Sequence, residues 1–196
     1  MTHFKQPIGL LFGSFNPIHL GHLTIAKFIM EDQKLHEIWF IVSPQNPFKE
    51  QNLLINRDHR YNMVKLAIEN EPRFNVSDIE FSMPTPSYTY KTFQKLHTLY
   101  PGNDFQLIMG SDNLDSFLRW KNVDEIIKEH PILVYPRTGS TLHIPDKLIQ
   151  CTTITSAPEV DVSSTLIRSH LKNGIDVSTY LSIEVYKYIK MHKLYN

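Results

Sequence analysis

The chain has 196 residues, 41% of them hydrophobic, and its 20 basic and 20 acidic residues give a formal net charge of zero. This length supports one domain with a full hydrophobic core better than two independent domains. The balanced charge argues against a nucleic-acid-binding protein, which usually carries a basic excess. A net charge of zero is still compatible with binding of an anionic small molecule, because a local cluster of hydrogen-bond donors does not change the total charge.

The sequence also indicates a compartment. Cys151 is the single cysteine, so no internal disulfide can form, which fits a reducing environment. The first seven residues lack an apolar core of signal-peptide length. No apolar run approaches the roughly 20 residues of a membrane span. We therefore expect a cytoplasmic protein without a membrane segment.

Strand-like and helix-like segments alternate along the chain. In chain order the pattern predicts a strand at 8–12, a helix at 20–34, a strand at 38–42, a helix at 57–69, a strand around 74–76, a helix at 87–99, a strand at 105–109, a helix at 123–129, strands at 132–135 and 148–154, and helices that begin near 164 and 183. Continuous apolar strands between helices indicate a parallel sheet covered on both faces. The sequence thus predicts an α/β fold with a doubly wound parallel sheet. We expect one domain over residues 1–196, with 163–196 as its helical C-terminal part.

Four polar clusters follow predicted strands directly, at residues 13–22, 43–49, 110–112 and 163–168. In sheets of this kind ligands bind beyond the carboxyl ends of the strands. We therefore expect all four clusters to face one crevice. The proline-rich loop at 82–87 is a further candidate for a binding loop.

The first cluster combines a turn with two histidines. Gly13 permits close backbone approach, and Ser14 and Phe15 can offer main-chain N–H groups to an anion at the start of the next helix. His19 and His22 lie one turn apart on one helix face and can donate hydrogen bonds to phosphate oxygens. A plain helix start with two surface histidines stays open. A zinc site is the third alternative, but no carboxylate or cysteine stands nearby at ligand spacing.

The last cluster is a helix start that carries a cation. Ser163 or Ser164 can cap the helix, and Arg168 lies one turn beyond Ser164 on the same face. Hydroxyls, N-terminal amides and a guanidinium group together suit a triphosphate. Taken alone, this segment is better interpreted as a capped helix with a surface arginine.

The first and last clusters, "GSFNPIHLGH" and "SSTLIR", resemble the paired motifs of the nucleotidyltransferase superfamily. The chain resembles, more narrowly, the bacterial nicotinate-nucleotide adenylyltransferases. The likeness continues in order through "SPQNPFK", "RYNMVKLAI", "PSYTYKTFQKL", "GSDNLDSFLRWKN" and "VYKYIKMHKLY". It implies a Rossmann-like nucleotidyltransferase fold. It also implies adenylyl transfer from ATP to nicotinate mononucleotide, which yields nicotinate adenine dinucleotide and pyrophosphate in NAD biosynthesis.

The resemblance also implies roles for individual residues. Lys49 would contact the phosphate region of the mononucleotide, and Tyr88, Thr89 and Trp120 would surround its pyridine ring. The residues that would bind ATP are Gly13, Ser14, Phe15, His19, His22, Gly110, Asp112, Ser164, Thr165 and Arg168. The residues that would act in catalysis are His19, His22, Lys49 and Arg168. Mg²⁺ would be held through the ATP phosphates, with no metal ligand from the protein.

The chain departs from the family pattern at three positions. Phe12 stands in place of a usual glycine, Asn16 in place of an aspartate, and Phe48 in place of a histidine. Phe48 cannot hydrogen-bond a phosphate, so the contribution of that loop would depend on Lys49. Simpler readings also remain for single residues: Trp120 and Tyr88 could pack in the core, and Asp112 could cap a helix.

Two other functions remain as alternatives. Phosphopantetheine adenylyltransferases share the first motif, but they are usually shorter and lack the "GSDNLDSFLRWKN" context. A regulator that binds a nucleotide without turnover would keep the same crevice. The sequence leaves open the choice between the nicotinate and nicotinamide nucleotides, and whether the chain forms a homo-oligomer.

Overall fold

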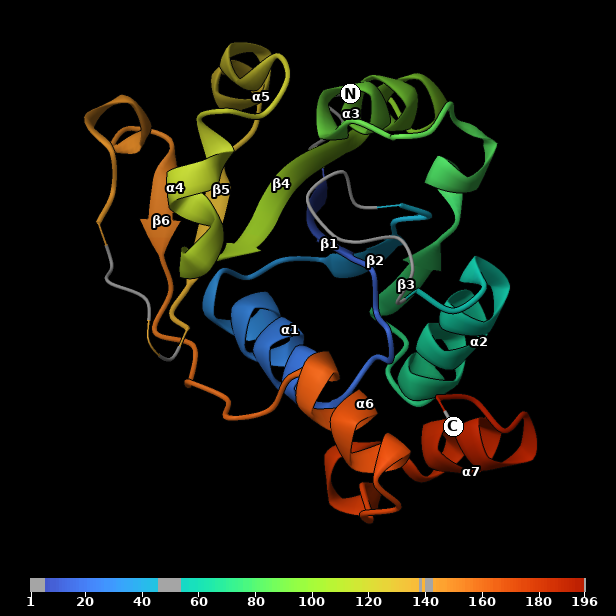
Figure 1. The fold of residues 1–196 in the computed structure, drawn as a ribbon. Coiled ribbons are helices and arrows are strands. Elements are labelled where there is room, and N and C mark those ends of the chain that lie inside the picture. The colour runs from blue at the N-terminus through green and yellow to red at the C-terminus, as the bar shows by residue number, and fades with distance from the viewer. Residues whose placement is uncertain (1–5, 46–53, 138, 140–142, 196) are drawn as a thin grey trace.

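A computed structural model of the chain describes residues 6–45, 54–137, 139 and 143–195. Six parallel strands form one sheet in the order β3-β2-β1-β4-β5-β6 (Figure 1). The strands are β1 (Gln6–Gly13), β2 (Glu37–Val42), β3 (Phe74–Ser77), β4 (Asn103–Gly110), β5 (Ile132–Tyr135) and β6 (Thr152–Ile154). The predicted doubly wound parallel sheet is confirmed.

Helices cover both faces of the sheet (Figure 1). One face carries α1 (Leu20–Asp32), α2 (Arg57–Ile68), α6 (Ser164–Lys172) and α7 (Ile183–Met191). The other carries α3 (Thr89–Leu99), the short α4 (Leu114–Phe117) and α5 (Val123–Glu129). Short 3₁₀ helices lie at η2 (Ile79–Ser82), η3 (Ser111–Asn113), η4 (Asp146–Leu148) and η5 (Ser178–Tyr180). Within the described ranges, no helix is both long and apolar enough to cross a bilayer.

The central strand β1 is apolar without interruption because helices cover both of its faces. Successive side chains of a strand point to opposite faces of a sheet. In β1, Leu10 belongs to the cluster that contains Phe93 and Leu96 of α3. Its neighbour Leu11 belongs to the opposite cluster, with Ile29 of α1. Both faces are buried, so both sets of side chains must be apolar.

The expected strand at 148–154 is wrong in its first half. Residues Asp146–Leu148 form η4, and β6 begins only at Thr152. Leu148 is apolar because it is fully buried in the core, and this burial gives the same sequence pattern as a strand. The four-residue α4 was not predicted, because one turn is too short to show helical periodicity.

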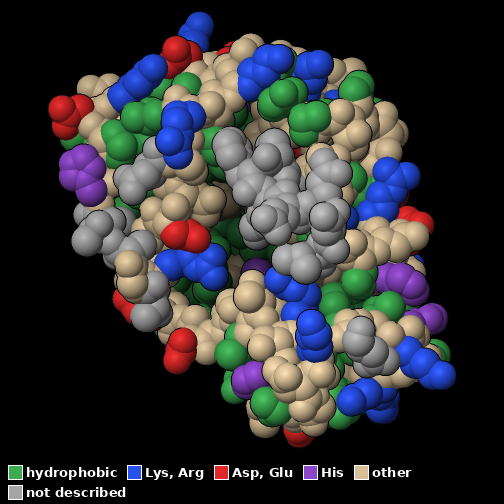
Figure 2. Space-filling model, in the orientation of Figure 1, with side chains coloured by type: hydrophobic (Ala, Val, Ile, Leu, Met, Phe, Trp, Pro, Cys, Tyr) green, Lys and Arg blue, Asp and Glu red, His purple; other side chains and the backbone are tan. Residues whose placement is uncertain are grey.

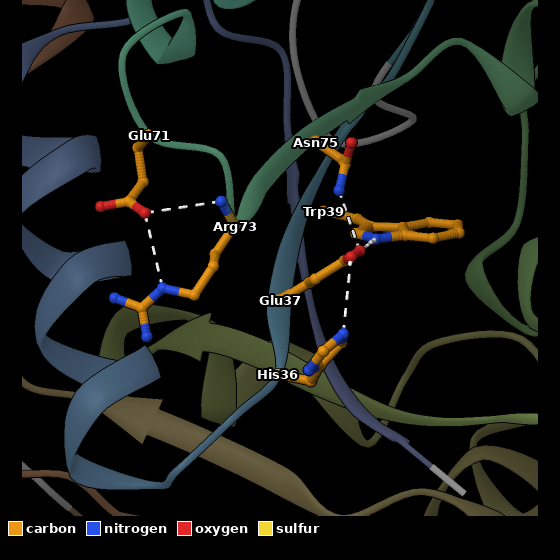
Figure 3. A network of polar contacts seen from close by, with 6 residues as sticks. All are labelled: His36, Glu37, Trp39, Glu71, Arg73 and Asn75. Carbon is orange, nitrogen blue, oxygen red and sulfur yellow. Dashed lines mark hydrogen bonds and ion pairs between the residues drawn. The ribbon is translucent and has the colours of Figure 1, made fainter.

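A polar network joins β2 and β3 near their amino ends (Figure 3). The Glu37 carboxylate accepts hydrogen bonds from Trp39 Nε1, at 2.6 Å, and from Asn75 Nδ2, at 2.8 Å. Beside it, Arg73 forms an ion pair with Glu71 at 3.5 Å. This network lies at the amino ends of the strands, whereas the expected crevice lies at their carboxyl ends. Trp39 is therefore a tryptophan remote from the expected crevice.

Candidate active site

A cavity of about 800 Å³ opens where β1 and β4 end. The strand order reverses at this pair, so the cavity occupies the topological switch point at which ligands bind in such sheets. Gly13 and Gly110, the last residues of the two strands, both line it, as does Ser43 after β2. Figure 2 shows the hollow at the centre of this face, with hydrophobic side chains within it and Lys and Arg side chains near its lower edge.

The loop between β1 and α1 folds back over the end of its own strand. Phe15 has a positive φ of 44°, and its buried ring covers Gly13. A Cβ atom at Gly13 would lie 2.7 Å from that ring, so only glycine fits beneath it. The absence of a side chain at Gly13 thus makes room for Phe15, and the approach of a phosphate to this backbone stays a prediction. The neighbouring Ser14 side chain is buried, and its Oγ has no hydrogen-bond partner among the described residues.

His19 and His22 lie against each other at the start of α1. Their ring centroids are 3.7 Å apart, and the backbone N–H of His19 donates to His22 Nδ1 at 3.3 Å. With Nδ1 as an acceptor, a neutral His22 carries its proton on Nε2 and can donate from there. Burial, reinforced by the nearby Arg137 guanidinium, lowers the pKa of His19 to about 4. His19 is therefore neutral at pH 7 without a bound anion.

The pair also bears on the zinc alternative. In the described part of the chain, no third histidine, cysteine or carboxylate forms a ligand cluster with His19 and His22. Two nitrogen ligands are fewer than protein zinc sites use. The geometry of the pair suits hydrogen-bond donation to an anion.

The start of α6 lies beside the same loop, although it is about 150 residues away in sequence. Ser163, not Ser164, caps the helix, with its Oγ accepting from the backbone N–H of Leu166 at 3.1 Å. Ser164 Oγ instead donates to the Pro17 carbonyl at 2.8 Å. The first and last clusters of the sequence therefore meet.

Arg168 completes this contact between the two clusters. Its Nη1 donates to the Asn16 carbonyl at 2.9 Å, and its Nη2 donates to Thr165 Oγ1 at 3.2 Å. A guanidinium has five N–H donors, so these contacts leave others for a ligand. The hydrogen bonds orient the side chain along the loop.

The residues after β4 form a second edge of the cavity. A Cβ atom at Gly110 would lie 2.5 Å from Asp112 Oδ1 and 2.7 Å from Arg137 Cδ. Asp112 is exposed and forms an ion pair with Arg137 at 3.2 Å. The sequence did not indicate this pairing, which connects the loop after β4 to the loop after β5.

The opposite end of the cavity is aromatic. Tyr88, Thr89 and Trp120 all line it. Trp120 is half-buried, packs edge-on against Phe117 at 5.1 Å between centroids, and has no described hydrogen-bond partner for its Nε1. Lys121 Nζ lies 4.7 Å from the centre of the Tyr88 ring. Trp120 thus combines the two expected roles, since it touches both the core and the cavity.

The remaining prediction for the site concerns the loop after β2. Lys49 and Phe48 lie outside the described residues, so their expected roles stay predictions.

Sequence reasoning missed Arg60 of α2. This side chain is almost fully buried, and its hydrogen-bond partners among the described residues are all backbone carbonyls. Its donors reach Ser14 at 2.6 Å, Ser43 at 2.7 Å, Pro44 at 3.0 Å and Ile55 at 3.2 Å. Burial lowers the pKa of Arg60 to about 10, which still leaves the group charged at pH 7. Arg60 therefore ties the loops after β1 and β2 together.

Glu80 was missed as well. It is buried at the edge of the cavity and accepts hydrogen bonds from Ser87 Oγ and Thr92 Oγ1, both at 2.7 Å. Burial raises the pKa of Glu80, although these hydrogen bonds oppose the shift. The carboxylate fixes the proline-rich 82–87 loop against the first turn of α3. One acidic residue between apolar neighbours gives no sequence signal for this role.

The chain is similar to known proteins over most of its length. The family model described as cytidylyltransferase-like matches residues 10–170. A Bacteroides thetaiotaomicron protein named probable nicotinate-nucleotide adenylyltransferase is 45% identical, over 95% of this chain and 92% of its own. A Flavobacterium psychrophilum protein of the same name is 43% identical, over 96% of this chain and 98% of its own.

The chain belongs to the cytidylyltransferase-like family and groups within it with the nicotinate-nucleotide adenylyltransferases. The solved structure of a Plasmodium falciparum nicotinic acid mononucleotide adenylyltransferase complexed with NaAD matches with a TM-score of 0.77. It is 22% identical and the match covers 97% of both chains, so it supports the nucleotidyltransferase fold.

Proposed function

We propose that this adenylyltransferase transfers the adenylyl group of ATP to nicotinate mononucleotide and releases pyrophosphate. One observation carries the proposal: the anion donors from the first and last motifs meet at the β1–α1 loop, and Gly13, at the start of this loop, lines the cavity that also holds the aromatic side chains. The names of the relatives agree with this chemistry.

The phosphate end would bind the triphosphate of ATP. His19 and His22 would donate from their imidazole nitrogens, the backbone amides of the Gly13–Phe15 turn would add to them, and Arg168 would supply the fixed positive charge. Ser164 and Thr165 would place their hydroxyl groups beside the same phosphates. Since His19 is neutral in the free protein, it contributes a hydrogen bond without a permanent charge.

In this reaction the phosphate of the mononucleotide attacks the α-phosphorus of ATP. A bond forms between that phosphate oxygen and the α-phosphorus, and the bond to the β-phosphate oxygen breaks, so pyrophosphate leaves. The attacking phosphate is already an anion near neutral pH, and it needs no general base. Catalysis would then come from alignment and from stabilisation of the developing charge. Lys49 would supply a further cation from the loop after β2.

Magnesium fits this site as a companion of ATP. The described groups at the phosphate end are imidazole, hydroxyl and guanidinium groups, whereas Mg²⁺ prefers oxygen ligands such as carboxylates and phosphates. The ion would therefore be held by the ATP oxygens, where it neutralises phosphate charge. Positioning of the nucleotides remains the task of the protein residues.

The other end of the crevice would hold the pyridine nucleotide. Trp120 offers a flat ring for stacking, and Tyr88 and Thr89 stand at the amino end of α3, where backbone N–H groups favour a carboxylate. These N–H groups at the amino end of α3 would favour the nicotinate over the nicotinamide form, because only the nicotinate form carries a carboxylate.

Gly110 and Asp112 would contact the adenylate ribose of ATP at the carboxyl end of β4.

The test is pyrophosphate release with ATP, Mg²⁺ and each candidate cosubstrate. We expect rapid release with nicotinate mononucleotide and a much lower kcat/KM with nicotinamide mononucleotide. Release with phosphopantetheine alone would assign the protein to that other family. ATP binding without release from any cosubstrate would indicate a non-catalytic nucleotide-binding protein.

A further inference from the structure

A second cluster of metal-ligating side chains lies away from the crevice. His97 is near the end of α3, Glu129 is the last residue of α5, and His130 follows it directly. One ligand atom from each lies within 4.8 Å of the other two. His130 precedes the start of β5, so the cluster lies near the amino ends of the strands, opposite to Gly13 and Gly110.

His130 is already arranged as a metal ligand. Its Nδ1 lies 3.0 Å from the Phe105 carbonyl, which can only accept, so Nδ1 carries the proton and Nε2 keeps a free lone pair. A backbone carbonyl on the far nitrogen is the usual way in which proteins orient a metal-bound histidine. The ring is also held by stacking on Phe93, at 3.7 Å and 14°.

The spacing of the two imidazoles fits one shared ion. Their ring centroids are 5.1 Å apart, with 15° between the ring planes. Two imidazoles on one tetrahedral zinc, with Zn–N bonds of about 2.0 Å, have centroids about 5.2 Å apart. Tetrahedral ligand atoms lie about 3.4 Å from one another, so the cluster has to close slightly around an ion. The two rings are stacked, so the half-buried His97 has to turn toward the ion, and rotation of the exposed Glu129 side chain supplies the rest of the movement.

We propose that His97, Glu129 and His130 bind Zn²⁺, or a similar divalent transition-metal ion, and so connect α3 to α5. Two imidazoles and one carboxylate are a zinc-like ligand set, whereas magnesium prefers oxygen ligands alone. This site is separate from any Mg²⁺ carried by ATP. It also departs from the sequence analysis, which predicts no metal ligand from the protein.

The position of the cluster gives the ion a structural role. α3 and α5 pack against each other on one face of the sheet (Figure 1). Thr89 begins α3, and Trp120 lies shortly before α5. A bound ion would hold together the two elements that frame the aromatic end of the crevice. Glu125 lines the same small hollow and adds negative charge for a cation.

The test uses the full chain, stripped of metal with a chelator and then supplied with ZnCl₂. We expect about one retained Zn²⁺ per chain by elemental analysis. His97→Ala and Glu129→Gln should each weaken zinc binding, measured against a competing chelator dye, at least about tenfold. His36→Ala, an exposed histidine at the start of β2, is the matched control and should bind as the wild type does. Both test variants avoid His130, whose buried ring contributes to packing.

Thermal stability and Co²⁺ absorption also test the site. Zinc at about a hundredfold over its wild-type Kd should raise the Tm of the wild type by about 5 °C and that of His97→Ala by half as much or less. Co²⁺ should give the visible absorption bands of tetrahedral coordination, and Glu129→Gln should lose them. Zinc binding as tight in both variants as in the wild type would overturn the proposal. Loss of zinc in His22→Ala alone would do the same, because the ion would then lie in the crevice.

Discussion

At the scale of single residues, the phosphate end of the site contains a histidine, His19, whose burial keeps it neutral. His19 is buried, its ring is stacked on that of His22, and its Nδ1 has no partner among the described residues. An unpartnered buried polar atom is costly unless a ligand satisfies it. The cost is offset when a phosphate binds, which argues for positioning rather than proton transfer as the task of this pair.

We expect His22→Ala to lower kcat about a hundredfold, with the KM for ATP changed only a few-fold. A donor aimed at developing phosphate charge acts mainly in the transition state, so its loss appears in kcat. Steady-state kinetics check this, with circular dichroism to confirm folding and His36→Ala as the control. A raised KM with an unchanged kcat would show that His22 serves only in binding.

Acid sensitivity should follow from the buried His19. Its pKa is about 4 in the folded protein and about 6.5 in the unfolded chain, so between these values the unfolded state binds more protons. Stability is therefore full above pH 6.5 and falls as the pH drops toward 4. Urea unfolding at pH 7 and pH 4 should show that the wild type loses about 3 kcal/mol more than His19→Gln. Parallel losses in the two proteins would contradict this.

Trp120 should determine binding of the mononucleotide. We expect Trp120→Ala to raise the KM for nicotinate mononucleotide by tenfold or more, since base stacking on an aromatic ring contributes about 1–3 kcal/mol. The KM for ATP should stay nearly constant. Trp39→Ala is the matched control, because it removes a tryptophan at the far edge of the sheet (Figure 3) and should lower only Tm. Equal shifts of both constants in Trp120→Ala would limit this residue to packing.

At the scale of elements, α2 organises the crevice without lining it. Arg60 extends from α2 to carbonyl groups on the loops after β1 and β2. It can hold both loops because a guanidinium donates in several directions from one rigid plane. The positions of these phosphate-site loops thus depend on a side chain of the "RYNMVKLAI" stretch to which the sequence analysis assigns no role.

Replacement of Arg60 should therefore loosen both loops. We expect Arg60→Met to lower the free energy of unfolding by about 2–3 kcal/mol, because several carbonyls lose a charged donor. Amide hydrogen exchange at residues 13–16 and 43–45 should quicken by at least tenfold more than elsewhere. Arg57→Met, one turn earlier on the same helix, is the control: it loses an exposed hydrogen bond to the Phe81 carbonyl and should leave the exchange at residues 13–16 and 43–45 unchanged. Uniformly faster exchange across the sheet would show a global effect instead.

The sequence allowed the elements to be predicted better than their connections. Five of the six strands were predicted close to their observed bounds, because apolar runs report burial directly. The contact of α6 with the β1–α1 loop followed from the rule that ligands bind at the carboxyl edge. Arg60 was missed, although its spacing from Met63 and Val64 places it on the buried face of α2. Its partners are backbone carbonyls, which leave no trace in a sequence.

At the scale of the whole molecule, two side chains of the C-terminal segment converge on Asn16 in the loop after β1. Arg168 donates to its backbone carbonyl, and Tyr195 OH donates to its side-chain Oδ1 at 3.0 Å. α7 is held on α2 by Tyr188, whose hydroxyl lies 2.9 Å from His59 Nδ1. We propose that residues 163–196 belong to the same domain as the sheet, since the phosphate loop is fastened by them.

Tyr195 should therefore affect ATP binding, because its hydroxyl holds Asn16 in the phosphate loop. Burial raises the pKa of Tyr195, so its hydroxyl stays protonated and can donate to Asn16. We expect Tyr195→Phe to raise the KM for ATP about threefold and to lower the free energy of unfolding by about 1 kcal/mol. Tyr188→Phe is the matched control, because it also removes a hydrogen-bonded hydroxyl from the C-terminal segment, but one that contacts α2. It should lower stability similarly and leave the KM for ATP unchanged. Equal kinetic effects in the two variants would mean that the terminus stabilises the fold without positioning the phosphate loop.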